Sequence, residues 1–360
     1  MAEITEGFLL GIDNPLLDIS AEVPLEFIQK YGLQLNNATL STDETAEIPA
    51  ILVKDYKVTY IPGGASQNAI RTFQWMIGQP RSTVVLGSVG KDDFANILIE
   101  RISSEGVIPL YSVDEAAPTG NCSVLINAHE RSLVANLGAA NNYKIDHLKT
   151  PEVWSYVEKA KYFYISGYSL TVVPDGMELI AKHANETGKF FSINLSAPFI
   201  SQVPPFFNSL KTLIPYVDIL FGNEGEARAF GIASGLDENV TIADIALYIA
   251  RLPKENASRP RIAVITQGSS PTIVAYADGT THTYPVPPLL PEQMVDFNGA
   301  GDSFVGGFLS SHAKGETIAQ SINAAQYAAR QIIQQSGLQF PGPCDFVQVT
   351  ADEAAARATA

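Results

Sequence analysis

The regular alternation of short apolar segments with longer amphipathic ones constrains the fold most, and it runs from Gly63 to the C-terminal part of the chain. Short buried strands between helices of ten or more residues are typical of βαβ units, which place parallel strands side by side. The sequence therefore predicts an α/β protein with a mostly parallel sheet flanked by helices. We expect strands over residues 7–12, 82–87, 162–165, 190–194, 219–221 and 262–266, and helices over residues 66–77, 93–105, 175–186, 303–313 and 318–335.

Two segments interrupt this alternation. Residues 17–62 and 119–140 contain turns and short β-like stretches, and they lack the apolar spacing of a helix. Residues 1–16, 63–118 and 141–360 are then expected to form one large catalytic domain. The two interrupting segments are expected to form one small β-rich lid domain over the carboxyl edge of its sheet.

Composition and charge narrow the classes of partner. The formal net charge is −15, from 23 basic and 38 acidic side chains, and no basic stripe offsets it, so nucleic acid is not an expected partner. No apolar run approaches the ~18 residues of a membrane span, so a membrane is not an expected partner either. The acidic start, residues 1–6, lacks the basic segment of a signal peptide, which favours the cytoplasm. No exposed apolar strand marks a dimer interface, so we expect a monomer.

A glycine-rich turn over residues 296–302 precedes the expected helix 303–313. Gly299 and Gly301 allow the backbone to approach a ligand closely, and the free N–H groups of a helix start attract an anion. A carboxylate such as Asp302 is unexpected beside an anion unless it accepts a proton from an attacking hydroxyl. The motif thus indicates either a phosphoryl-transfer site or a plain strand-to-helix turn in which Asp302 caps the helix. In the first case Asp302 is the base, and the backbone of Gly299, Ala300 and Gly301 forms an anion hole.

A second glycine motif stands at the junction with the expected lid. Gly63 and Gly64 permit close approach of the backbone to a substrate, and Asn68 follows on the first turn of the next helix. Alone, this sequence predicts only a turn. Neither the P-loop pattern nor G-x-G-x-x-G occurs in the chain, so any phosphate chemistry must use the turn at Gly299.

Together the two glycine motifs resemble the two signatures of the ribokinase-like (PfkB) carbohydrate and nucleoside kinases, over nearly the whole chain. Within that family, the further similarity is to the adenosine kinases. The segments that carry it are residues 14–18 (NPLLD), 74–77 (QWMI), 131–133 (RSL), 194–201 (NLSAPFIS), 222–227 (GNEGEA), 266–268 (TQG) and 340–341 (FP). The resemblance implies a ribokinase-like fold with a Rossmann-like central sheet and a small lid. It also implies transfer of the ATP γ-phosphoryl group to the 5′-hydroxyl of adenosine, with Mg²⁺, in purine salvage.

The resemblance also implies roles for individual residues. Asp302 would be the base, and Asp18 and Asn68 would hold the ribose hydroxyls beside the backbone of Gly63 and Gly64. The remaining nucleoside contacts implied are Asn14, Leu16, Leu133, Leu137 and Tyr168. The implied phosphate and ATP contacts are Arg131, Asn223, Thr266, Gly268 and Gln326, and Asn223 and Glu226 would organise Mg²⁺ through its waters.

Some positions depart from the pattern of these kinases. Phe297 replaces a common Thr or Ser, Ala65 a frequent Ser, Ser169 a frequent aromatic residue, and Gln326 a frequent His. These changes leave two alternatives open beside an adenosine kinase. One is a PfkB-type sugar kinase acting on ribose or fructose, and the other is a nucleoside-binding pseudokinase.

Overall fold

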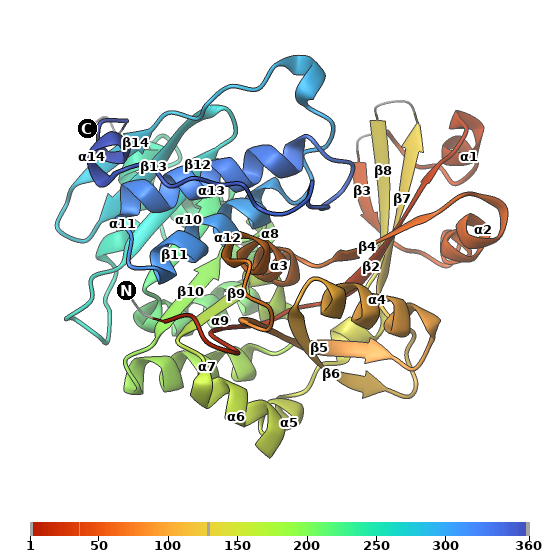
Figure 1. Ribbon diagram of the computed structural model, residues 1–360, viewed down its shortest axis with the longest axis horizontal. Helices are drawn as coiled ribbons and strands as arrows, with labels where there is room; N and C mark the ends of the chain where they lie inside the picture. Colours follow the sequence, from red (N-terminus) through yellow and green to blue (C-terminus); the bar gives the residue numbers. More distant parts are fainter. Residues whose placement is uncertain (1–2, 36, 128–129, 358–360) are drawn as a thin grey trace.

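In a computed structural model of the chain, residues 3–35, 37–127 and 130–357 are described, and their strands form two sheets (Figure 1). The larger sheet has the strand order β14-β13-β12-β11-β10-β9-β1-β5-β6, and the smaller has the order β3-β8-β7-β2-β4. The strands are β1 Leu9–Ile12, β2 Leu16–Glu22, β3 Asn37–Leu40, β4 Thr59–Gly63, β5 Thr83–Gly90, β6 Val107–Asp114, β7 Asn121–Asn127, β8 Glu130–Asn136, β9 Tyr162–Ser166, β10 Phe190–Asn194, β11 Ile219–Asn223, β12 Ile262–Gln267, β13 Ser270–Tyr276 and β14 Thr281–Tyr284.

The larger sheet confirms the predicted α/β class. Every strand pair from β6 across to β12 is parallel, whereas β13 and β14 extend the sheet as antiparallel strands. The antiparallel edge was not predicted. β13 and β14 follow β12 through tight turns with no helix between them, and this connection makes neighbouring strands antiparallel. Parallel strands end at the same edge of a sheet, so the carboxyl ends of β1, β9, β10, β11 and β12 lie together.

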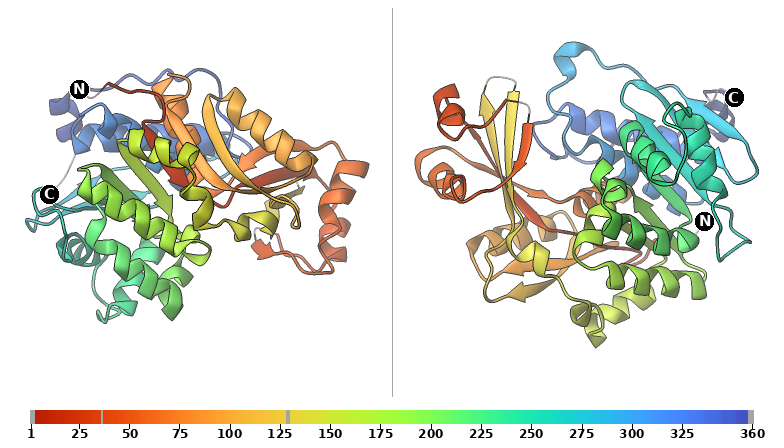
Figure 2. Two further views of the ribbon diagram at one scale, coloured as in Figure 1. Left: turned by 90° about the horizontal axis from the view of Figure 1, so that it is seen from below. Right: turned by 180° about the vertical axis from the view of Figure 1, so that it is seen from behind.

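Helices cover both faces of the larger sheet (Figure 2). Buried side chains of α6, α7, α9, α10 and α11 pack on one face, and those of α3, α4, α12 and α13 on the other. None of the helices in the described residues is long and apolar enough to cross a membrane. The helices are α1 Leu25–Lys30, α2 Ile48–Asp55, α3 Ala65–Ile77, α4 Asp93–Ser104, α5 Ile145–Leu148, α6 Pro151–Lys159, α7 Pro174–Glu186, α8 Pro198–Gln202, α9 Pro204–Leu213, α10 Glu224–Ala233, α11 Ile242–Arg251, α12 Ala300–Ala313, α13 Ile318–Ile333 and α14 Ala351–Ala355, with 3₁₀ turns η1 Gly138–Asn142, η2 Gly167–Thr171, η3 Ile214–Tyr216 and η4 Pro291–Gln293.

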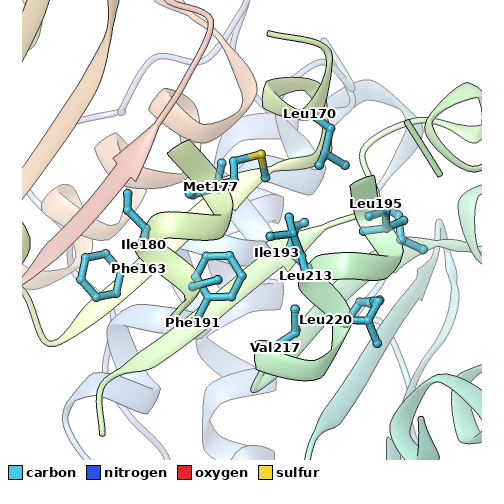
Figure 3. Packing of buried hydrophobic residues seen from close by; sticks show 14 of the residues in the cluster. Phe163, Leu170, Met177, Ile180, Phe191, Ile193, Leu195, Leu213, Val217 and Leu220 are labelled. Atoms are coloured by element: carbon cyan, nitrogen blue, oxygen red, sulfur yellow. The ribbon is translucent and has the colours of Figure 1, made fainter. Parts of the chain in front are cut away.

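Successive residues of the central strands point to opposite faces of the sheet, which divides the core into two clusters. Phe163 packs on the α7 face and Tyr162 and Tyr164 on the α12 face. Figure 3 shows the α7 cluster, in which Met177 and Ile180 of α7 lie over strand residues such as Phe163. Both faces are buried, which is why these strands are almost continuously apolar in the sequence.

The smaller sheet lies at the end of the molecule opposite the two termini (Figure 1). It carries α1 and α2 on one face, around a separate apolar cluster that includes Ile28, Ile48 and Leu52. The expectation that residues 17–62 contain only turns and short β-like stretches was therefore wrong in part. Both helices are short, with six and eight residues, and one or two buried residues per helix give too little periodicity to recognise.

Candidate active site

Two cavities lie at the carboxyl edge of the larger sheet, where α3 and α12 begin. The larger has a volume of about 220 Å³, the smaller has about 40 Å³ and lies against the smaller sheet, and Gly299 borders both. The larger is lined by Ala65, Tyr168, Asn194, Ser196, Phe221, Gly222, Asn223, Glu226, Val264, Thr266, Gly299, Gly301, Asp302, Phe304 and Val305. The smaller is lined by Asp18, Ser20, Ile61, Asn68, Val124, Arg131, Leu133, Asp296, Asn298, Gly299, Gly337 and Leu338.

Asp302 lies in the first turn of α12, which begins at Ala300, three residues earlier than predicted. Its Oδ2 accepts a hydrogen bond from Nδ2 of Asn68 at 3.0 Å. Burial raises the pKa of this carboxyl to about 7; the bond from Asn68 lowers the pKa, and the nearby carboxylates of Asp13 and Glu226 raise it. A carboxylate with a pKa near neutrality is suited to accept a proton during a reaction.

The turn before α12 has the geometry that its glycines predict. Gly299 has a φ of 76°, in the left-handed region, and a Cβ on it would lie 2.8 Å from Cδ1 of Leu338. The N–H of Ala300 donates to the carbonyl of Phe297 at 3.2 Å, so one of the three predicted anion-hole groups is engaged within the turn. Gly301 borders the larger cavity, and a Cβ on it would meet no atom within 4 Å. Its backbone faces open space that a ligand can occupy.

The other glycine pair lies against two carboxylates. A Cβ on Gly63 would lie 2.5 Å from Oδ1 of Asp18, and a Cβ on Gly64 would lie 2.0 Å from Oδ2 of Asp13. Gly64 also has a φ of 110°, so no other residue fits there without strain. Burial raises the pKa of Asp18 to about 7, although the positive charge of Arg71 lowers it. Asp18 and Asn68 line the same cavity, as a pair of groups that bind neighbouring hydroxyls must.

The predicted nucleoside contacts divide into two groups. Leu133 lines the smaller cavity. Asn14 lies between β1 and β2 with its carbonyl oxygen against Gly64, and Leu16 packs against Gly120, but neither residue lines either cavity. Leu137 also lies outside both cavities, where its carbonyl approaches Gly120.

Tyr168 lies on η2 and lines the larger cavity. Its hydroxyl donates to the carbonyl of Ser196 at 3.1 Å, and its ring centroid lies 6.1 Å from that of Phe199. The adjacent Ser169 is fully buried and donates to the carbonyl of Ile12 at 3.3 Å. Ser169 therefore belongs to the packing between η2 and β1, and only Tyr168 of this pair faces the site.

Arg131 links the smaller sheet to the turn before α12. Its Nη1 lies 3.0 Å from Oδ2 of Asp296, and its Nη2 donates to Oγ of Ser336 at 3.1 Å. Asp296 is 5% exposed and also accepts from the N–H of Gly337 at 2.8 Å. In this structure the guanidinium predicted to clamp a phosphate is paired with a buried carboxylate at the wall of the smaller cavity.

Asn223 and Glu226 form a capping box at the start of α10. The backbone N–H of Asn223 donates to Oε2 of Glu226 at 2.9 Å, and its Nδ2 donates to Oε1 at 2.7 Å. Burial raises the pKa of Glu226. Both residues line the larger cavity, and both carboxylate oxygens of Glu226 already accept hydrogen bonds. The pair therefore suits Mg²⁺ held through its water shell, because Mg²⁺ dehydrates reluctantly.

Of the three remaining predicted ATP contacts, only Thr266 lines the larger cavity. Thr266 is the penultimate residue of β12. Gly268, with a φ of 58°, makes the turn into β13 and has no atom within 4 Å of where a Cβ would be. Gln326, on α13, is buried and donates to the carbonyl of Pro285 at 3.1 Å, and it lines neither cavity.

Sequence reasoning missed two carboxylates of this region, Asp13 and Asp296. Asp296 stood inside the glycine-rich motif, but nothing local showed that it is buried against Arg131. Asp13 follows a short strand, where a polar residue normally indicates an exposed turn. Its burial was detectable only through Gly64, which is distant in the sequence.

Residues 26–344 match the sequence model of the pfkB family carbohydrate kinases, and the chain belongs to that family. It is 46% identical over 342 residues to adenosine kinase 2 of Arabidopsis thaliana, with 95% of this chain and 98% of that protein covered. The fold, with its mostly parallel larger sheet and its second sheet, agrees with this family.

Solved structures show the same similarity. Adenosine kinase of Anopheles gambiae, in complex with P1,P4-di(adenosine-5) tetraphosphate, has a TM-score of 0.86 and 43% identity, with 95% of this chain and 100% of that chain covered. Adenosine kinase of Schistosoma mansoni, in complex with 2-fluoroadenosine, has a TM-score of 0.85 and 35% identity, with 95% of this chain and 99% of that chain covered.

Proposed function

We propose that this protein is an adenosine kinase, which transfers the γ-phosphoryl group of ATP to the 5′-hydroxyl of adenosine and yields AMP and ADP. The observation that carries the proposal is the place of Asp302 and Gly299. Asp302 is bonded to Asn68 of the smaller cavity and itself lines the larger one, and Gly299 borders both. The carboxylate of Asp302 therefore lies between the two cavities. From there it can accept the proton that an acceptor hydroxyl in the smaller cavity loses when it receives a phosphoryl group from a ligand in the larger one. The similarity to adenosine kinases supports the choice of acceptor.

The smaller cavity is proposed to hold the ribose. Asp18 and Asn68 would bind the ribose hydroxyls, because a carboxylate and an amide side by side select a cis-diol. Gly63 has room for no side chain beside Asp18, so its backbone lies against the same hydroxyls. Leu133 lines this cavity and would contact the nucleoside. The resemblance also assigns nucleoside contacts to Tyr168, which lines the adjoining larger cavity, and to Asn14, Leu16 and Leu137, which line neither cavity.

Asp302 is proposed to accept the proton of the 5′-hydroxyl as that oxygen attacks the γ-phosphorus. The start of α12, with Gly299, Ala300 and Gly301, would donate N–H groups to the charge on the transferring phosphoryl group. The transition state of phosphoryl transfer is loose, so positioning and charge stabilisation contribute more than the strength of the base.

The larger cavity is proposed to hold the triphosphate. Asn223 and Glu226 would hold Mg²⁺ through its waters, and Thr266, Gly268 and Gln326 would lie along the ATP. When bound with ATP, Mg²⁺ neutralises charge on the phosphates. Arg131 would exchange Asp296 for a phosphate when the small β-rich domain, residues 17–62 and 119–140, closes over the remaining α/β domain. We also propose that the enzyme acts as a monomer in the cytoplasm, in purine salvage.

A coupled assay of ADP release with MgATP and adenosine, inosine, ribose or fructose tests the proposal. We expect turnover to be fastest, and KM lowest, with adenosine. A preference for ribose or fructose would identify a sugar kinase. Tight adenosine binding without ADP release would identify a nucleoside-binding protein that lacks catalysis.

A further inference from the structure

Asp13 is a buried carboxylate to which the proposed reaction assigns no role. It directly follows β1 and is 1% exposed. Its N–H donates to the carbonyl of Leu86 at 2.9 Å, and its Oδ1 accepts from the N–H of Ser66 at 2.9 Å. Its Oδ2 is buried and has no hydrogen-bond partner among the described residues. Burying a carboxylate oxygen in this way is costly, so its place needs an explanation.

The turn at Gly64 is shaped around this carboxylate. Gly64 has a φ of 110°, and a Cβ there would lie 2.0 Å from Oδ2 of Asp13 and 2.8 Å from the carbonyl oxygen of Asn14. Gly64 is the residue before α3, and its carbonyl accepts from the N–H of Asn68 at 2.8 Å. Asp13 therefore fixes both the turn and the first residues of the helix that follows.

That helix carries the group that binds Asp302. Asn68 lies in the first turn of α3 and donates to Oδ2 of Asp302. Ser66, whose N–H is bound by Asp13, also accepts from the N–H of Ser166 through its Oγ at 2.8 Å. The end of β1, the end of β9 and the start of α3 are thus joined at Ser66, two residues before the Asn68 that bonds Asp302.

Asp13 also contributes to the electrostatic environment of Asp302. Burial raises the pKa of Asp13 to about 7, and its charge is one of those that raise the pKa of Asp302. The groups that face Asp302 are Asn68 of α3, Asp13, Glu226 of α10, and the hydroxyls of Tyr164 and Tyr168. Those that face Asp13 are the N–H groups of Asn14, Ser66 and Gln67, the hydroxyl of Ser66, Tyr111 of β6, Tyr164 and Asp302.

We propose that Asp13 is a positioning residue for the reaction: its buried carboxyl group fixes the Gly64 turn, from which α3 places Asn68 against Asp302, and it puts a second ionisable group behind that base. This inference rests on the proposed role of Asp302 as base. Two buried carboxyls that interact share their titration, and each disfavours ionisation of the other.

Two substitutions separate the two parts of the proposal. Asp13→Asn keeps the acceptor for the N–H of Ser66 and removes the ionisable group. Asp13→Ala removes both. Ser66→Ala is the matched control, since it alters the same turn and the bond to Ser166 and keeps the N–H that Asp13 binds. It changes no charge and removes only the Ser66 hydroxyl, which by itself lowers the pKa of Asp13.

The experiment is the pH dependence of kcat/KM for adenosine with saturating MgATP, between pH 5.5 and pH 9, for these three variants, the unchanged protein and Asp302→Asn. For Asp13→Asn we expect the acidic limb to move to lower pH by about half a unit or more, because a neighbouring negative charge is removed, with kcat at pH 8 within about threefold. For Asp13→Ala we expect the same shift and a fall in kcat at pH 8 of about tenfold or more. Ser66→Ala should move the limb much less than Asp13→Asn does, because it keeps the carboxyl group and only weakens one of its hydrogen bonds.

The outcomes are distinguishable. An unmoved acidic limb in soluble, folded Asp13→Asn would overturn the proposal, and so would an equal shift in Ser66→Ala. If Asp13→Asn does not fold, the infrared band of protonated carboxyl groups provides a second readout. At pH values around 7, a second carboxyl group should then titrate differently in Asp302→Asn than in the unchanged protein. If that second group titrates identically in the two proteins, the result would equally contradict the proposal. Failure of the proposed function looks different, as absence of adenosine turnover in the unchanged protein or full turnover in Asp302→Asn.

Discussion

Asn68 donates a hydrogen bond to Asp302 at 3.0 Å, and this contact joins the start of α3 to the start of α12. Each residue follows a glycine turn, and each turn was recognisable in the sequence. The structure shows that the two turns face each other. The contact occupies one carboxylate oxygen of Asp302 and leaves Oδ1 for a hydroxyl group.

Asn68→Ala is expected to lower kcat/KM for adenosine by about tenfold to hundredfold, the usual cost of a hydrogen bond to a charged group. Because the bond from Asn68 lowers the pKa of Asp302, the acidic limb of the pH profile should also move to higher pH. Thr72→Val is the control, since Thr72 bonds the carbonyl of Asn68 and the hydroxyl of Ser303. If the control moved the limb as far as Asn68→Ala did, the link to Asp302 would be wrong.

Gly301→Ala should separate binding from folding. A Cβ at Gly301 meets no protein atom within 4 Å, so the midpoint of thermal unfolding should stay within a degree or two. A γ-phosphoryl group approaching the N–H of Gly301 would meet that methyl group, so kcat should fall by about tenfold or more. Unfolding followed by circular dichroism and a steady-state assay provide the two values. Unchanged kcat would place the phosphoryl group elsewhere.

Gly64→Ala should destabilise the protein by about 2 kcal/mol or more, because the new Cβ adds a collision with Asp13 to an unfavourable φ. Gly188→Ala is the matched control, with a φ of 69° and no atom within 4 Å of the added Cβ, and it should cost about 1 kcal/mol. Urea unfolding measures both. Equal losses in the two variants would mean that Asp13 does not restrict this turn.

Asp18→Asn should stabilise the protein in a pH-dependent way. Burial raises the pKa of Asp18 in the folded protein from 3.8 to about 7. The folded state therefore binds the proton more tightly than the unfolded state, and the contribution of Asp18 to stability falls as pH rises from about 4 to about 7. The unfolding free energy of Asp18→Asn minus that of the unchanged protein should increase over this range by roughly 1–4 kcal/mol and then level off. A difference that decreases with pH would contradict the assigned direction.

The sequence predicted the parts of the fold that depend on local pattern. Strands such as Phe190–Asn194 and helices such as Ala65–Ile77 have apolar spacings that only one kind of element satisfies. Helices α1 and α2 were not predicted, because each is too short for its spacing to be distinctive, and they form only by packing on the smaller sheet. The assignment of residues 17–62 and 119–140 to a separate lid domain stays a prediction.

At the site, the glycine motifs were predictable because a turn with positive φ requires particular residues locally. What those turns contact was not predictable. Asp13 is buried against Gly64, and Arg131 is paired with Asp296. Both contacts form only when segments distant in the sequence meet. The same reason explains why the place of Gln326 was not predictable. Its amide donates to the carbonyl of Pro285, and the residue lines neither cavity.

The central claim is that Asp302 is the base of a kinase acting on adenosine, and the most direct test is the turnover number of Asp302→Asn with adenosine and MgATP at pH 8. The substitution preserves the shape of the side chain and removes the proton acceptor. We expect kcat to fall by about 10² to 10⁴, with no loss of thermal stability at that pH, because burial already disfavours the charged form of Asp302. A folded Asp302→Asn protein that phosphorylates adenosine at the unchanged rate would contradict the claim.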